Sequence, residues 1–70
     1  MNISVNGQQT SVDDAITVSD LLAVLHGAET ATRGIAVALN GEVVSRSRWR
    51  ESTLQEGDRL EVLRAVGGGA

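Results

Sequence analysis

The sequence predicts an α+β fold in which one amphipathic helix packs on one face of a mixed sheet. Three observations lead to this prediction. Apolar and polar residues alternate at the start of the chain, apolar residues recur at helical spacing after residue 20, and Asn-Gly pairs at positions 6–7 and 40–41 mark hairpin turns. The resulting order is two strands, a helix, two strands, an irregular crossing and a last strand. We expect a roll whose last strand pairs centrally with the first.

The chain begins with a predicted β-hairpin. Ile3 and Val5 alternate with polar residues, as in a strand with one buried face. The Asn6-Gly7 pair then predicts a tight turn. A second strand is expected over residues 8–12.

Residues 17–25 predict the helix. Thr17 is the expected N-cap, and Asp20 three residues later completes an acidic version of the capping box. The apolar residues that recur at helical spacing are Leu21, Leu22, Val24 and Leu25. Gly27 is the expected C-terminal stop. His26 falls at this helix end, where the helix dipole favours a protonated imidazole, and we interpret it as structural.

The second half of the chain predicts three more strands. Residues 28–34 are small and polar, as in a connecting loop, whereas residues 35–39 are apolar on both faces, as in a central strand. The Asn40-Gly41 pair predicts a second hairpin turn, and residues 42–44 are its returning strand. A last strand is expected over residues 59–66. Its inward residues are Leu60 and Val62, and its outward residues are Arg59, Glu61 and Leu63.

An irregular crossing over residues 46–56 precedes this last strand. It has no clean period, so we expect one helical turn around Trp49, an anchor at Leu54 and a turn at Gly57-Asp58. Trp49 is the chain's single aromatic residue, and we predict that it fills the core, because a thin aliphatic core gains most from its largest side chain.

Size and composition restrict the class of protein. Seventy residues allow one small domain, expected over residues 1–66, followed by a flexible Gly-rich tail over residues 67–70. The absence of cysteine excludes disulfides and thiolate sites. No apolar run approaches the length of a membrane span and the start lacks the features of a signal peptide, so we expect a cytoplasmic protein with no membrane partner. A thin core and a mobile tail are typical of a monomer that forms transient complexes.

The polar residues do not predict an enzyme. Asp13 and Asp14 are adjacent, so in an extended chain they point to opposite faces, and solvation before the helix suits both. Metal binding needs several ligands at matched spacing, which one histidine and scattered carboxylates do not offer. We therefore expect no catalytic residues, no metal site and no bound cofactor.

Three arginines flank the tryptophan. Arg46, Arg48 and Arg50 alternate around Trp49, which superficially resembles a nucleic-acid stripe with a stacking aromatic ring. The formal charge of −3 is the wrong sign for such a role, so no nucleic-acid partner is expected. A solvated loop and a protein-docking patch both remain as interpretations.

The C-terminal residues are the strongest candidate site. Gly67, Gly68 and Gly69 are followed only by Ala70, so no helix follows to make a phosphate-binding loop. One interpretation is a frayed end. The other is a substrate: four extended residues carry the terminal carboxyl roughly 13 Å beyond the last strand, and glycines thread a narrow channel.

Several segments together resemble the thiamin-biosynthesis sulfur-carrier family, ThiS, of the ubiquitin-like superfamily. They are residues 35–44, 46–49 and 54–58 and the Gly-rich end, in this order and spacing. The resemblance implies a β-grasp fold, a mixed sheet of about five strands with one main helix on one face. It also implies a Gly-Gly carboxyl that an E1-like activating enzyme adenylates with ATP and magnesium. A sulfur donor system then makes a thiocarboxylate, which supplies sulfur to thiazole synthase.

The family pattern assigns the tail. Gly68 and Gly69 match its two glycines, whereas Ala70 extends beyond its usual end. Ala70 is removed, or foreign to the natural chain, or tolerated as the terminal residue, or the chain is not a working carrier. We predict Gly69 as the reactive residue after removal of Ala70. We also predict that Leu63 and Arg64 form a docking patch for the activating enzyme, with ordinary edge hydrophobicity as the alternative.

Two other functions remain open from the sequence. One is a sulfur carrier for molybdopterin or another pathway, which shares the fold and the tail but uses a different acceptor. The other is a ubiquitin-like interaction module without tail chemistry, and Ala70 is the feature that favours it.

Overall fold

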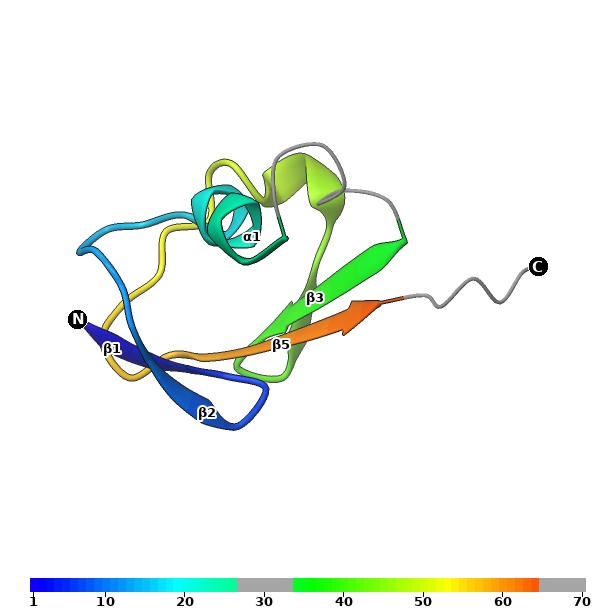
Figure 1. The fold of residues 1–70 in the computed structure, drawn as a ribbon. Coiled ribbons are helices and arrows are strands. Elements are labelled where there is room, and N and C mark those ends of the chain that lie inside the picture. The colour runs from blue at the N-terminus through cyan, green and yellow to red at the C-terminus, as the bar shows by residue number, and fades with distance from the viewer. Residues whose placement is uncertain (27–33, 65–70) are drawn as a thin grey trace.

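The computed structural model describes residues 1–26 and 34–64, which form one sheet with a helix on one of its faces (Figure 1). The elements in chain order are β1 (Asn2–Val5), β2 (Gln8–Ser11), α1 (Val18–His26), β3 (Ile35–Leu39), β4 (Glu42–Val44), the 3₁₀ turn η1 (Arg46–Arg48) and β5 (Arg59–Arg64). Gly27, the predicted helix stop, lies outside the described residues. No helix in the described ranges is long and apolar enough to cross a membrane.

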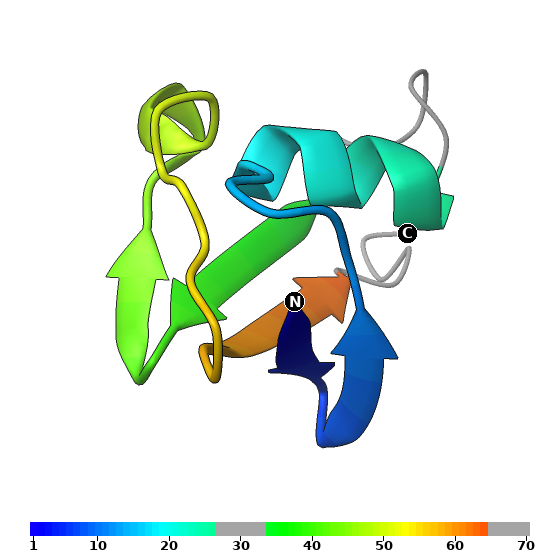
Figure 2. The same ribbon diagram turned by 90° about the vertical axis from the view of Figure 1, so that its left-hand side faces the viewer.

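The sheet has the strand order β2-β1-β5-β3-β4. β1 and β5 pair in parallel at its centre, and the other neighbours are antiparallel. This confirms the predicted mixed sheet and the central pairing of the first and last strands. α1 lies across one face, and the chain runs from β4 through η1 along the same side (Figure 2).

Both Asn-Gly turns form as predicted. Asn6 and Asn40 each have a φ of 51°, and the glycines that follow have φ of 84° and 90°. Two successive positive φ values are typical of the turn whose twist matches a hairpin. The second strand ends at Ser11, one residue earlier than expected. Val12 still continues the pairing between the two strands of the hairpin, because its backbone N–H donates to the carbonyl oxygen of Met1 at 2.8 Å.

The start of α1 has the predicted capping box. The backbone N–H of Asp20 donates to Oγ1 of Thr17 at 3.1 Å, and the N–H of Thr17 donates to Oδ2 of Asp20 at 3.4 Å. The apolar spacing is only partly used. Leu21 and Leu22 are buried, but Val24 is 75% exposed and Leu25 43% exposed. Val24 lies off the stripe that Val18, Leu21 and Leu22 turn toward the sheet.

The core is aliphatic apart from one aromatic ring. Its buried members are Ile3, Val18, Leu21, Leu22, Ile35, Val37, Trp49, Leu54 and Leu60. Trp49 is 3% exposed, and its Nε1 donates to the carbonyl oxygen of Val44 at 3.0 Å. The predicted core role of Trp49 and the helical turn beside it are therefore confirmed.

Leu54 is the predicted anchor of the crossing. It is 1% exposed, and its backbone N–H donates to the carbonyl oxygen of Ile16 at 2.8 Å. The same backbone makes an isolated bridge between Thr17 and Thr53. The irregular segment is thereby tied to the N-terminal end of α1, and β5 starts from a fixed position.

Candidate functional site

The candidate site is built on β5, the strand that leads to the C-terminal tail. Gly67, Gly68, Gly69 and Ala70 lie outside the described residues. β5 lies between β1 and β3 and has a strand on both sides. In Figure 1 its arrow ends on the side of the molecule opposite the N-terminus. A chain leaving this strand starts from the middle of the sheet rather than from an edge.

β5 divides its side chains between the two faces of the sheet as predicted. Leu60 is buried and Val62 packs against the core, whereas Arg59 and Glu61 are exposed. Leu63 is 69% exposed on the face away from α1. The side chain of Arg64, which we predicted as its partner in docking, is outside the described part of the structure.

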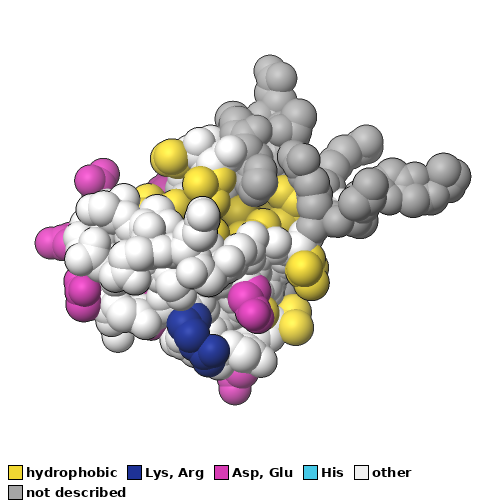
Figure 3. Space-filling view, turned by 60° about the horizontal axis from the view of Figure 1, so that its bottom comes forward, with side chains coloured by type: hydrophobic (Ala, Val, Ile, Leu, Met, Phe, Trp, Pro, Cys, Tyr) yellow, Lys and Arg dark blue, Asp and Glu magenta, His cyan; other side chains and the backbone are white. Residues whose placement is uncertain are grey.

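Leu63 stands in a shallow apolar hollow on the open face. Ala36 lies opposite Leu63 in the β3–β5 register, and Val43 lies opposite Ala38 in the β3–β4 register. The hollow has a volume of about 230 Å³ and is lined by Asn6, Ala36, Val37, Ala38, Val43, Glu61 and Leu63. Figure 3 brings the underside of the sheet forward and shows hydrophobic side chains standing out there, with charged side chains beside them.

Val43 is the residue of this hollow that sequence reasoning missed. It is 82% exposed, the most exposed of the large apolar side chains that the structure describes. The short returning strand was predicted, but its faces were not assigned. Alternation along this strand is the signal that could have found it. Successive side chains of a strand point to opposite faces, so Val43 points outward if Val44 points toward the core, as it does in the structure.

The three arginines do not join this hollow. They lie on η1 and just after it, and η1 lies beside α1 on the covered side of the sheet (Figure 2). The guanidinium of Arg46 sits 5.9 Å from the centroid of the Trp49 ring. Because that ring is buried in the core, it is not a platform for an incoming base.

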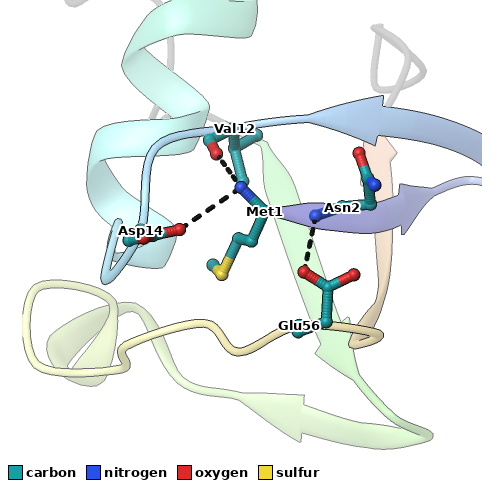
Figure 4. Close-up of polar contacts among 5 residues, drawn as sticks. All are labelled: Met1, Asn2, Val12, Asp14 and Glu56. Atoms are coloured by element: carbon teal, nitrogen blue, oxygen red, sulfur yellow. Dashed lines mark hydrogen bonds and ion pairs between the residues drawn. The ribbon is translucent and has the colours of Figure 1, made fainter.

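One of the two adjacent aspartates lies beside the amino group of the first residue. Asp14 approaches the amino group of Met1, with 3.3 Å between its Oδ1 and the nitrogen, and the same amino group donates to the carbonyl oxygen of Val12 at 2.7 Å (Figure 4). The Asp14 side chain is 90% exposed, so this ion pair contributes little to stability. Nearby, the N–H of Asn2 donates to Oε1 of Glu56 at 3.0 Å. These contacts fasten the start of β1 to its surroundings.

Residues 1–26 and 34–64 contain no group of three or more histidine, cysteine or acidic side chains placed to hold a metal ion. Within the same ranges, no buried side-chain nitrogen or oxygen lacks a hydrogen-bond partner. The side chain of His26, which we interpreted as structural, is outside the described part. What the described residues offer is an apolar surface beside the strand that carries the tail.

The family model ThiS matches residues 3–69, which is nearly the whole chain. The chain belongs to the ThiS family. It is 30% identical over 69 residues to the sulfur carrier protein ThiS of Escherichia coli, covering 99% of this chain and 100% of that protein. It is also 33% identical over 70 residues to a thiazole synthase of Paramagnetospirillum magneticum. That match covers the whole chain but only 21% of the synthase, so the chain spans about a fifth of this relative's length.

Solved structures agree with the ThiS assignment. The crystal structure of the thiamine biosynthesis protein ThiS from Geobacter metallireducens has a TM-score of 0.80 and 38% sequence identity, and the match covers 99% of this chain and 100% of that one. SAMP1 from Haloferax volcanii shares the fold, with a TM-score of 0.58 at 24% identity over 97% of each chain. The fold is thus the ubiquitin-like β-grasp expected from the resemblance.

Proposed function

We propose that this chain is a sulfur carrier of thiamin biosynthesis, in which the C-terminal carboxyl carries the sulfur. The observation that supports this most is the family match, which runs through the body and reaches Gly69 in the tail. A relative that this chain matches over its whole length is named a sulfur carrier protein, and a longer relative that includes a similar segment is named a thiazole synthase. Under this proposal the body presents the tail and contributes no catalytic residue.

The chemistry follows from the properties of a carboxyl group. A C-terminal carboxylate is ionised at neutral pH and resists nucleophiles, so it first needs a good leaving group. An E1-like activating enzyme supplies one: the carboxylate oxygen attacks the α-phosphorus of magnesium-bound ATP, an acyl adenylate forms and pyrophosphate leaves. A sulfur nucleophile from the donor system then attacks the acyl carbon and AMP leaves. The nucleophile is a persulfide sulfur, so the adduct is an acyl disulfide. A thiol of the donor system attacks its sulfur–sulfur bond, which breaks to give a disulfide of the donor system and the thiocarboxylate. The thiocarboxylate then donates its sulfur to thiazole synthase.

We assign the reactive carboxyl to Gly69, with Gly68 before it and Ala70 removed beforehand. Glycine has no Cβ, so the acyl carbon at this position is open to the activating enzyme and to the sulfur nucleophile. Gly67 adds length between the body and the reactive residue. The family match ends at residue 69, which supports this assignment.

We assign the docking of the activating enzyme to the hollow around Leu63, with Arg64 next to it on β5. An exposed apolar patch marks an interaction surface when it is contiguous, and this one joins side chains from three neighbouring strands. It also lies on the strand that leads to the tail. An enzyme seated there has the reactive carboxyl within a few extended residues of its docking site.

Intact-mass measurement tests this function. The chain ending at Gly69 and the chain ending at Ala70 are each incubated with ATP, magnesium and the activating enzyme, and then with a sulfur donor. We expect the chain ending at Gly69 to gain an adenylate and then to exchange one oxygen for sulfur. Thiazole synthase added afterwards should return it to the carboxylate. Two chains that stay unmodified under all conditions would contradict the proposal.

A further inference from the structure

The strand β5 has little backbone pairing on its β1 side. The parallel register joins only two residue pairs, of which the second is Val5 with Leu60. After Val5 the chain turns back at Asn6 and Gly7 into β2. β1 therefore ends while β5 continues to Arg64.

The side chain of Asn6 takes over where β1 ends. Its Oδ1 accepts a hydrogen bond from the backbone N–H of Val62 at 2.8 Å, and its Nδ2 donates to the carbonyl oxygen of Val62 at 3.3 Å. The backbone N–H of Asn6 donates to the carbonyl oxygen of Leu60 at 2.9 Å. A carboxamide offers the same donor and acceptor as a peptide group, so this side chain replaces one further residue of β1. Within residues 1–26 and 34–64 it is the last hydrogen-bonding partner of β5 on this side.

The second Asn-Gly turn holds the opposite end of the same strand. Oδ1 of Asn40 accepts from the N–H of Arg59 at 2.9 Å, and the N–H of Asn40 donates to the carbonyl oxygen of Arg59 at 2.8 Å. Nδ2 of Asn40 also donates to Oδ1 of Asp58 at 3.1 Å. The two asparagines thus bind the first residue of β5 and a residue two positions before its end.

The two contacts differ in what lies beyond them. After Arg59 the strand continues between two neighbours, so Asn40 supports a segment that is already fixed. After Val62 the strand is paired through Leu63 and Arg64 with β3 alone. Without the Asn6 carboxamide, residues 62–64 would be paired with β3 alone, and the direction of this end of β5 would be less fixed. Asn6 also lines the hollow that contains Leu63.

We propose that Asn6 is a positioning residue that fixes the direction in which β5 presents the tail to the activating enzyme. The inference rests on the proposed function, because it concerns how the reactive carboxyl reaches its partner. In this role Asn6 acts through Val62 rather than on the reacting group itself. Holding a reactive group in one orientation raises the rate at which it reacts within the bound complex. Loss of this orientation therefore lowers turnover.

Matched glycine variants separate this role from general stability. Asn6→Gly and Asn40→Gly each remove a carboxamide that binds β5, and glycine adopts the positive φ of both positions without strain. For Asn6→Gly we expect the Val62 amide to exchange at least about tenfold faster with solvent, since it loses its acceptor. Turnover in adenylation, measured at a saturating concentration of the carrier chain, should fall about fivefold to tenfold. Saturation removes any change in affinity from this measurement, which is needed because Asn6 also lines the docking hollow. Asn40→Gly should leave the exchange rate of the Val62 amide and the turnover near those of the unaltered chain.

A conservative variant adds a second control. Asn6→Asp keeps an oxygen acceptor for the Val62 N–H but loses the donor to the Val62 carbonyl oxygen, so we expect turnover between that of Asn6→Gly and the unaltered chain. Unchanged turnover in Asn6→Gly, or an equal loss in Asn40→Gly, would overturn the positioning role. An unaltered chain that is not adenylated at all would overturn the proposed function and this role with it. A normal unaltered chain beside a normal Asn6→Gly variant overturns this inference alone.

Discussion

The two faces of the sheet use the same kind of side chain for different ends. On β5, Leu60 is 1% exposed under α1, whereas Leu63 is 69% exposed on the open face. Both are leucines, three positions apart on one strand. Because side chains alternate along a strand, β5 stabilises the core through one face and leaves the other face available for the proposed docking surface.

Exposure alone does not make a docking surface. Val24 on α1 is 75% exposed, more than Leu63, and the structure gives it no role in the tail-bearing strand. Val24 also lines a hollow, which lies between the end of β2 and α1. Leu63 differs because its hollow lies on the strand that leads to the tail. The comparison between these two residues therefore tests location rather than hydrophobicity.

The largest expected effect is a loss of stability when a buried side chain on the covered face is shortened. Leu60→Ala should lower the free energy of unfolding by about 2–5 kcal/mol, because it removes buried methyl groups and leaves a cavity in a small core. Leu63→Ala is the matched control and should change that free energy by less than about 0.5 kcal/mol. Urea unfolding measures both. Equal losses in the two variants would remove the distinction between the faces.

The next effect is on the affinity of the open face for the activating enzyme. Leu63→Asp should weaken binding of the activating enzyme by about tenfold, because a charge would enter the centre of the apolar hollow. Val24→Asp adds the same charge at an exposed apolar site on α1 and should leave the affinity unchanged. Calorimetric titration of each variant with the activating enzyme provides the measurement. Unchanged binding by Leu63→Asp would retire the docking assignment.

The smallest effect concerns the element that covers the buried face. Thr17→Ala removes the hydroxyl that accepts from the Asp20 N–H and should lower the free energy of unfolding by about 1 kcal/mol. Thr17→Ser keeps a hydroxyl and should restore most of this loss. Thermal unfolding followed by circular dichroism compares the two. A Thr17→Ala variant as stable as the unaltered chain would show that the capping box is dispensable.

The sequence predicted the fold well because most of its signals are local. The capping box at Thr17 and Asp20 and the turn at Asn6-Gly7 each lie within four residues, and each determines one element. The alternation in β5 also assigned Leu63 to the outward side. The partial exposure of Leu25 was not predicted, because helical spacing does not show how much of a stripe the sheet covers.

The contacts made by the asparagine side chains could not be predicted in the same way. Asn6 and Val62 are 56 residues apart, and no local pattern connects them. Their hydrogen bonds depend on the register between the first and last strands. The sequence predicted that these two strands pair, but not which of their residues lie opposite one another. The assignment of the tail likewise came from resemblance to a family, since three glycines alone do not distinguish a reactive end from a frayed one.

The location of the sulfur decides whether the C-terminal carboxyl is the group that carries it. The chain is taken through adenylation and sulfur loading, its C-terminal peptide is released by a protease, and fragmentation in a mass spectrometer identifies the residue that carries sulfur. We predict that one oxygen of the Gly69 carboxyl is replaced by sulfur and that every side chain is unmodified. Sulfur found at any other position, or on none, would contradict the account.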